Sequence, residues 1–292
     1  MTKATLRWAL ISLSLLLVGP AVAWVVGGLR DVDGGRAVTL LVNGSLPRGL
    51  LSGLVVFAAA TLVGAVGARF LALGLGVTCA GIVLAWAAWS MGTAEDVLRR
   101  ANSPADLPRL ALEGFLVTAA AAALCAFLTK VATHRDAHLA PRNAKGIPGL
   151  IYPTDTEADA RLTLAIAVPA AIAAAAAVTW LLAVTNARGQ TLAAALFGAV
   201  AAAAAAQVIA ASRRCLITPA VPALAVAAVA LAGPLIANAV QGSRIIDLTF
   251  SDHLLPIARP ISLDWAAGTL LGIPLGLSWA GSMLEKKLVE PA

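Results

Sequence analysis

Long apolar runs separated by short polar segments dominate the chain. A helix that crosses the hydrocarbon core of a bilayer needs about 20 mostly apolar residues. Eight stretches meet this requirement: Ala9–Leu29, Leu50–Ala68, Phe70–Ser90, Leu110–Lys130, Leu162–Val184, Leu192–Ser212, Leu216–Val240 and Asp264–Ser282. The pattern therefore predicts an all-α integral membrane protein, a polytopic bundle of about eight transmembrane helices.

The composition supports a membrane protein over a soluble one. Of the 292 residues, 60% are hydrophobic and only 12% are charged, and the mean hydropathy is +0.88. Soluble domains carry roughly 25% charged residues. We therefore expect one transmembrane domain over residues 1–292, packed in contact with membrane lipids.

A weak internal similarity raises the alternative of a four-plus-four helix repeat, 1–134 and 155–292. Leu107-Pro108-Arg109 precedes Glu113, and Leu255-Pro256 with Arg259 precedes Asp264. Parallel repeats of this kind occur in some transporters.

The distribution of Lys and Arg predicts the orientation in the membrane. With the N-terminus in the cytoplasm, 12 of the 21 basic residues lie on the cytoplasmic side and nine on the other. Cytoplasmic loops carry an excess of Lys and Arg. We therefore expect a multi-pass protein of the cell membrane (the inner or plasma membrane), with both termini in the cytoplasm.

One extramembrane segment has a helix-start pattern. Thr93 is followed three residues later by Asp96, which resembles a capping box, and Val97 and Leu98 come next. This spacing predicts a short surface helix after the third apolar run.

Two acids stand inside the predicted outer ends of apolar helices, Glu113 and Asp264. An ionisable group near lipid is costly unless it is paired or hydrated, so such residues often mark ion, proton or substrate sites. The alternative is structural, because negative charge is favourable near a helix N-terminus. Gln207 is the main polar residue deep in an alanine-rich run and joins the two acids as a candidate site residue.

The last apolar run carries a stripe of small residues at four-residue spacing, Gly268, Gly272, Gly276 and Ala280. Small residues let two membrane helices approach closely. The stripe therefore predicts a helix-packing face, either within the chain or against another subunit, and the packing within the chain is favoured.

The main predicted cytoplasmic loop begins with basic residues, His134, Arg135, His138, Arg142 and Lys145. Such a segment either docks anionic lipid or a partner, or serves only as a positive-inside determinant. Two His residues without a third ligand do not form a metal site. We expect no metal and no cofactor, and no basic stripe with interleaved aromatics indicates nucleic acid.

Two function classes remain close on the sequence. The first is a non-catalytic membrane subunit that packs against partner proteins or forms a homo-oligomer. The second is a permease or transporter with a site near the outer ends of the fourth and eighth helices. A membrane-embedded enzyme acting on lipid ranks third, because the chain lacks phosphate-loop, HExxH and GxSxG motifs.

Overall fold

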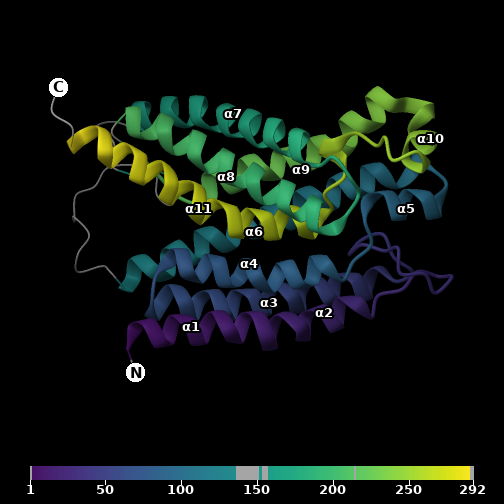
Figure 1. Ribbon diagram of the computed structural model, residues 1–292, viewed down its shortest axis with the longest axis horizontal. Helices are drawn as coiled ribbons and strands as arrows, with labels where there is room; N and C mark the ends of the chain where they lie inside the picture. The colour runs from purple at the N-terminus through teal and green to yellow at the C-terminus, as the bar shows by residue number, and fades with distance from the viewer. Residues whose placement is uncertain (1, 136–150, 153–156, 214, 290–292) are drawn as a thin grey trace.

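The computed structural model describes residues 2–135, 151–152, 157–213 and 215–289. Long helices run roughly parallel or antiparallel to one another in two packed groups (Figure 1). The group formed by the start of the chain holds α1 to α4, and the other holds α7, α8, α9 and α11. Helix α6 packs against α9 and α11 and also contacts α3 and α4, so it joins the two groups.

The first group begins with one long helix in three segments: α1 (Lys3–Leu13), the π-helical η1 (Ser14–Val18) and α2 (Gly19–Gly27). Pro20 lacks a backbone N–H, which disturbs the α-helical ladder at this point. Gly19 faces Trp86, since a Cβ there would lie 2.1 Å from the indole ring. Helices α3 (Leu46–Phe70) and α4 (Leu73–Trp89) complete the group.

The second group consists of α7 (Glu157–Leu182), α8 (Arg188–Ser212), α9 (Ala220–Gln241) and α11 (Ser262–Val289), joined by α6 (Leu107–Arg135). Helix α8 packs along both α7 and α11, and α11 also packs along α4. Most of the buried residues of α8 are alanines, including Ala195, Ala199 and Ala203. Small side chains let these backbones approach closely in a bilayer.

Short elements gather at one end of the bundle. They are α5 (Ala94–Ala101), η2 (Pro104–Asp106), η3 (Gly242–Arg244), α10 (Ile245–Phe250) and η4 (Pro256–Ala258). Together with the loop 28–45, called the first loop, and the segment 183–187, they form the loop-rich end (Figure 1). The predicted capping box is confirmed, because the Thr93 hydroxyl and the Asp96 carboxylate each bind the other's backbone N–H at the start of α5.

At the opposite end, two short strands pair. Strand β1 (Ile151–Tyr152) lies antiparallel to β2 (Leu216–Ile217), with Ile151 opposite Ile217 and Tyr152 opposite Leu216. The same end holds the beginning of α1 and the end of α11 (Figure 1).

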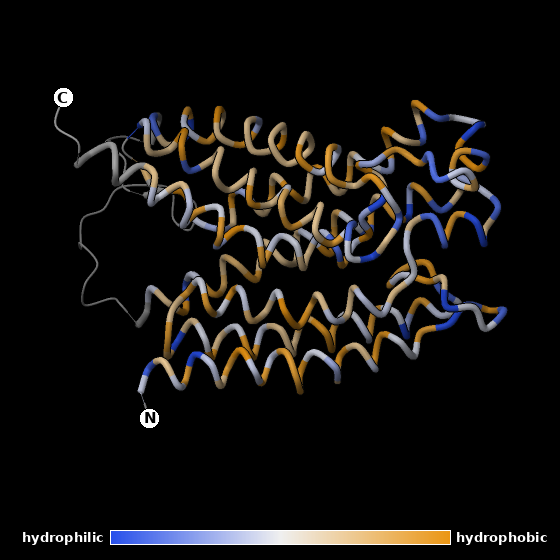
Figure 2. The backbone as a smooth tube through the Cα atoms, in the orientation of Figure 1, coloured by the Kyte–Doolittle hydropathy of each residue, from blue (hydrophilic) through white to orange (hydrophobic). Residues whose placement is uncertain are grey.

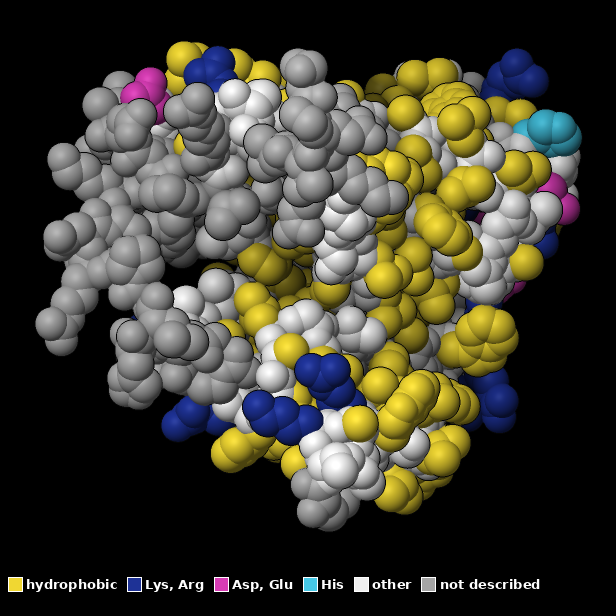
Figure 3. All heavy atoms as spheres, turned by 60° about the vertical axis from the view of Figure 1, so that its left-hand side comes forward, with side chains coloured by type: hydrophobic (Ala, Val, Ile, Leu, Met, Phe, Trp, Pro, Cys, Tyr) yellow, Lys and Arg dark blue, Asp and Glu magenta, His cyan; other side chains and the backbone are white. Residues whose placement is uncertain are grey.

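The fold is that of a multi-pass membrane protein. Hydrophobic residues occupy the middle of the helices and polar residues the two ends (Figure 2). In the space-filling view, hydrophobic side chains cover much of the described surface and charged side chains are few (Figure 3). Among the described residues, seven helices are long and apolar enough to cross a membrane: Lys3–Gly27, Leu46–Phe70, Leu73–Ala101, Pro104–Thr133, Asp159–Leu182, Arg188–Ser212 and Ala220–Phe250.

The structure also refines the predicted boundaries. The second span extends through Phe70, so the turn into α4 falls at Leu71 and Ala72 rather than at Arg69. The eighth predicted span, Asp264–Ser282, lies within α11, which is not among those seven helices.

Candidate functional site

Glu113 is a fully buried acid on α6, close to the loop-rich end. Its Oε2 accepts hydrogen bonds from the Thr39 hydroxyl at 2.6 Å and from the Leu41 N–H at 2.8 Å. Its Oε1 accepts from the Leu40 N–H at 3.1 Å and from the Ser262 hydroxyl at 2.5 Å. Each oxygen thus meets one backbone N–H and one hydroxyl, and the carboxylate ties the first loop to α6 and α11.

The part of the first loop that binds Glu113 is also held by its own contacts. The Asn43 side chain donates to the carbonyls of Thr39 and Leu40 at 3.1 and 2.7 Å. The Thr39 hydroxyl accepts from the Val42 N–H at 3.1 Å. A Cβ at Gly49 would lie only 1.8 Å from the Leu40 carbonyl oxygen, so glycine permits α3 to pack against the loop.

Asp264 lies in the first turn of α11 and is 5% exposed. Its Oδ2 accepts from the Ile261 N–H at 3.2 Å, which satisfies one of the donors left free at a helix start. The carboxylate also lies beside the Thr191 side chain and within electrostatic reach of Arg188, both on α8. Asp264 therefore stabilises the first turn of α11 and links it to the start of α8.

The structure places both predicted acids at the first turn of α11: Glu113 contacts this turn from α6, and Asp264 is part of it. Ser262 binds Glu113, and Asp264 follows two residues later on α11. The groups that surround the Glu113 oxygens, two backbone N–H groups and two hydroxyls, all donate to them, an arrangement that suits an anionic carboxylate. The contacts of both acids join parts of the protein to one another.

Gln207 does not join this cluster. It lies 16 residues beyond Thr191 on α8, which is about 24 Å along the helix at 1.5 Å per residue. Its side-chain oxygen accepts from the Ile217 N–H at 3.4 Å, so it contacts β2 at the opposite end of the bundle.

The small-residue stripe of α11 packs inside the chain. A Cβ on Gly268, Gly272 or Gly276 would lie 2.6, 2.3 or 2.3 Å, respectively, from backbone atoms of α8. Ala280 continues the stripe and is 2% exposed. The three glycines are therefore covered by α8 and are not free to receive another subunit.

The predicted basic docking segment falls largely outside the described residues. Of its five residues, the structure describes only the backbone of His134 and Arg135, at the end of α6. His138, Arg142 and Lys145 lie outside the described residues. The docking role of this segment stays a prediction.

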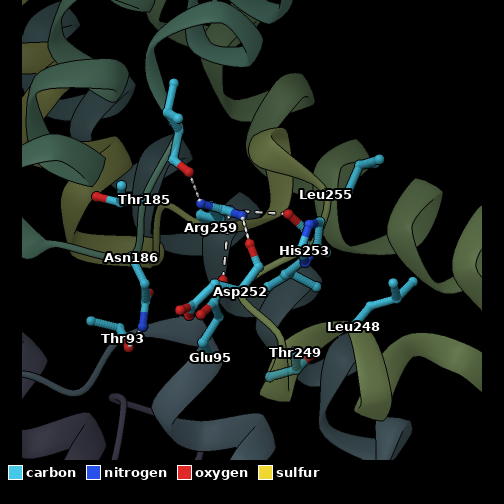
Figure 4. Close-up of polar contacts among 12 residues, drawn as sticks. Thr93, Glu95, Thr185, Asn186, Leu248, Thr249, Asp252, His253, Leu255 and Arg259 are labelled. Carbon is cyan, nitrogen blue, oxygen red and sulfur yellow. Dashed lines mark hydrogen bonds and ion pairs between the residues drawn. The ribbon is translucent and has the colours of Figure 1, made fainter.

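A group of charges that the sequence did not predict lies at the loop-rich end. We call Glu95, Arg99, Asp252 and Arg259 the arginine–carboxylate cluster. Figure 4 labels three of its members, Glu95, Asp252 and Arg259. The Glu95 carboxylate is fully buried, with the Arg259 Nε at 3.6 Å and the Arg99 Nη2 at 3.3 Å. Arg99 also contacts Asp252 at 2.5 Å. A buried acid is thereby placed between two guanidinium groups.

Arg259 is almost fully buried and points into the cluster (Figure 4). It donates to the backbone carbonyls of Leu254 at 3.0 Å and Asp252 at 2.6 Å, and also to that of Val184. Arg99 donates to the Thr249 carbonyl at 3.0 and 3.1 Å. These contacts join α5, α10 and the segment after α7 into one unit.

Asp252 occupies an unusual position in this unit. Its φ of 58° lies in the left-handed region, which Asp tolerates better than most residues. Hydrogen bonds with Glu95 and Arg99 hold the pKa of its exposed carboxyl below the ordinary value. The ionised form of Asp252 is thus favoured by its neighbours in the cluster.

Helix α5 connects the cluster to the first loop. Arg100 pairs with Asp31 and donates to the Ala37 carbonyl at 3.3 Å. The Asn186 side chain donates to the Thr93 hydroxyl at 2.8 Å. The loop-rich end is therefore cross-linked by polar contacts between segments that are far apart in the sequence.

Two polar atoms in the interior of α11 have no hydrogen-bond partner in the described part of the chain. They are the indole nitrogen of Trp265 and the hydroxyl of Thr269, one turn apart and both buried. Buried polar groups are usually hydrogen-bonded to protein or to ordered water. This pair follows directly after Asp264.

Comparison with protein-family models, with curated proteins and with solved structures gives no match. Within the described residues, no group of three or more His, Cys, Asp or Glu side chains could hold a metal ion. Function must therefore be inferred from the contacts described above.

Proposed function

We propose that this protein is a non-catalytic integral membrane subunit that binds a partner protein through its loop-rich end. The observation that supports the proposal is the cross-linking of this end by buried polar contacts. Glu113 fixes the first loop, and Arg259 fixes the segment before α11.

Rigid loops favour binding because a surface that is already ordered loses little conformational freedom when a partner docks. Helix α5 is joined to α10 through Arg99 and to the first loop through Arg100, and Arg259 holds the carbonyl of Leu254. These arginines bind backbone carbonyls, which fixes the shape of the surface. A preformed surface of this kind suits recognition of a folded protein.

Two apolar side chains stand out on this surface. Val32 in the first loop is 89% exposed, and Phe250 at the end of α10 is 57% exposed. Both belong to the loop-rich end, beyond the middle of the helices where lipid covers apolar residues. Apolar and aromatic side chains on a rigid support are typical anchors of protein interfaces.

The proposal includes a topology of eight spans with both termini in the cytoplasm of the cell membrane. The beginning of α1 and the end of α11 lie at the same end of the bundle, as an even number of crossings requires (Figure 1). In this arrangement α11 is the eighth span. The positive-inside rule then places the loop-rich end on the outer side, because it carries nine of the 21 basic residues.

The test is purification in mild detergent from the membranes of the native organism, with mass spectrometry of the co-purifying proteins. We expect a partner in stoichiometric amount with the wild type. The double variant Val32→Glu and Phe250→Glu should lose it, because both anchors become charged. The matched control Thr133→Glu, at an exposed site on the opposite end, should retain it.

A monomer without any stoichiometric partner would contradict the proposal. So would a partner that stays bound to the double variant, because the interface would then lie elsewhere. Size-exclusion profiles of all variants report whether the bundle itself stays folded.

One observation favours transport as a second candidate function. The unpartnered polar atoms of Trp265 and Thr269 lie next to Asp264, inside the bundle, where water or a polar substrate would satisfy them. A proton-coupled permease predicts pH-driven proton flux in proteoliposomes. That flux should be abolished by Glu113→Gln with Asp264→Asn and retained by Asp33→Asn, and the absence of flux in the wild type would exclude proton coupling.

A further inference from the structure

Three arginines line one small pocket at the loop-rich end. Arg30 and Arg36 come from the first loop, and Arg188 begins α8; the pocket has a volume of about 240 Å³ and is completed by Gly27 and Ser90, among others. Arg30 and Arg36 also line a neighbouring pocket of about 540 Å³ beside α2. Three arginine residues therefore line a shared space.

The arginines are positioned without being neutralised. Arg30 donates to the carbonyls of Gly27 and Leu29 at 2.5 and 2.6 Å, and Arg188 donates to the Trp89 carbonyl. A carbonyl holds a guanidinium in place and leaves its positive charge uncompensated, and a guanidinium has five N–H donors.

Acidic side chains compensate little of this charge. Asp264 is the acid within electrostatic reach of Arg188. Asp31 pairs with Arg100, and Asp33 binds the Gly35 N–H. Within the described part of the chain, the side chain of Arg36 has no ion-pair or hydrogen-bond partner. The pocket thus keeps an excess of positive charge.

An apolar groove is lined by residues close in sequence to those of this pocket. It has a volume of about 360 Å³ and is lined by Leu15, Ile82, Trp86, Trp89 and Leu192, with two further apolar residues. The lining residues of the groove and the pocket are neighbours on two segments. Trp89, the last residue of α4, directly precedes Ser90, and Leu192 lies one turn beyond Arg188 on α8.

We propose that the pocket and the groove together bind an anionic phospholipid from the leaflet at the loop-rich end. The phosphate of the headgroup binds the three arginines, whose planar donor groups match phosphate oxygens. One acyl chain lies in the groove against Trp86 and Trp89. The proposal is independent of the protein partner proposed above.

The apolar groove favours a lipid over a soluble anion. A free phosphate would use only the arginine pocket and would leave the apolar groove to bulk lipid. A phospholipid fills both, and its headgroup lies where membrane proteins place Trp at the interface. Arginine side chains bind phosphate oxygens through paired, charge-assisted hydrogen bonds.

The experiment is native mass spectrometry of the full-length protein after reconstitution into nanodiscs. The probes are phosphatidylglycerol, which is anionic, and phosphatidylcholine, which is zwitterionic. We expect the wild type to retain phosphatidylglycerol with at least a tenfold preference. The triple variant Arg30→Gln, Arg36→Gln and Arg188→Gln should lose that preference.

Matched variants separate the site from general effects of charge and folding. The control Arg48→Gln, Arg109→Gln and Arg244→Gln removes the same charge from exposed sites at the same end and should keep the preference. Arg36→Gln alone breaks no polar contact, so it should weaken retention without unfolding the protein.

Two further arms distinguish a lipid from a free anion. Ala85→Phe fills the groove and should reduce lipid retention while the three arginines stay in place. Displacement of the lipid by millimolar inorganic phosphate, or full retention in Ala85→Phe, would overturn the lipid assignment. Equal retention of both lipids by the wild type, or unchanged preference in the triple variant, would refute the site.

Discussion

Replacing Glu113 by Gln removes the negative charge at the centre of the first-loop contacts with almost no change in size. In the wild type each carboxylate oxygen accepts from one backbone N–H and one hydroxyl. Gln offers one oxygen and one NH₂ group. A hydroxyl can turn and accept from the NH₂ group, but a backbone N–H cannot.

The magnitude follows from the two possible orientations of the amide. If Nε2 replaces Oε2, the Leu41 N–H loses its acceptor; if it replaces Oε1, the Leu40 N–H does. A buried donor without an acceptor costs about 1–3 kcal/mol, and the remaining bonds weaken because they are no longer charge-assisted. We expect the opening of the loop to become easier by about 2–4 kcal/mol.

Hydrogen–deuterium exchange of peptides covering residues 37–43 measures this opening. With a tenfold change in rate for every 1.4 kcal/mol, exchange at Leu40 and Leu41 should accelerate by about 30-fold to 1,000-fold. The control Asp33→Asn lies in the same loop but is exposed, and its side chain contacts only the Gly35 N–H. Exchange in this control should change little.

A specific result would refute the reasoning. If Glu113 were a neutral acid in the native protein, Gln would be nearly equivalent to it. Exchange at Leu40 and Leu41 would then change by less than about threefold, which corresponds to well under 1 kcal/mol. The four donors would in that case not be holding a charge.

Three further substitutions test the packing and the charges, each by thermal unfolding in detergent. Gly272→Ala should destabilise the protein by about 1–3 kcal/mol because it drives α11 from α8, whereas Gly281→Ala, which meets open space, should not; equal effects would contradict the close packing. Thr269→Val should be neutral or stabilising because its hydroxyl has no partner, whereas Thr118→Val loses a 2.6 Å bond and about 0.5–1 kcal/mol; a larger loss at Thr269 would reveal a bound water or ligand. Arg259→Met should destabilise by about 3–5 kcal/mol because it leaves the buried carboxylate of the arginine–carboxylate cluster without its closest buried cation; a loss below 1 kcal/mol would mean that the remaining arginine suffices.

The helices were predictable because each apolar run is long enough to cross a bilayer, and length is a local property. The residues at which the helices begin and end were less predictable. Phe70 continues α3 past Arg69, because Arg near a helix end can extend its charge toward the interface while its backbone stays helical. The start of α5 was predicted correctly, since a capping box is contained within four residues.

The partners of the buried acids were not predictable from the sequence. Glu113 could be singled out as a costly residue, but its donors Thr39 and Ser262 lie 74 and 149 positions away. Nothing in the local sequence pattern distinguishes Arg259 from the other loop arginines, because it is the packing of the folded chain that buries Arg259 against Glu95. The Glu95–Arg99 spacing of four residues was the single local indication of that cluster.

The loop-rich end has equal numbers of arginines and acidic residues, but the two kinds of charge are not evenly distributed over it. Nine arginines lie there: Arg30, Arg36, Arg48, Arg99, Arg100, Arg109, Arg188, Arg244 and Arg259. Nine acids accompany them: Asp31, Asp33, Glu95, Asp96, Asp106, Glu113, Asp247, Asp252 and Asp264. Several of the acids are turned inward, where protein donors hold them.

The acids that make this end rigid are bound by other groups and therefore do not neutralise the three-arginine pocket. Glu113 is bound by hydroxyls and backbone N–H groups, and Asp31 is bound by Arg100, so neither compensates Arg36. A negative headgroup from outside the chain would restore the balance locally. The two effects are separable, because Glu113→Gln should loosen the first loop and Arg36→Gln should weaken lipid retention without loosening that loop.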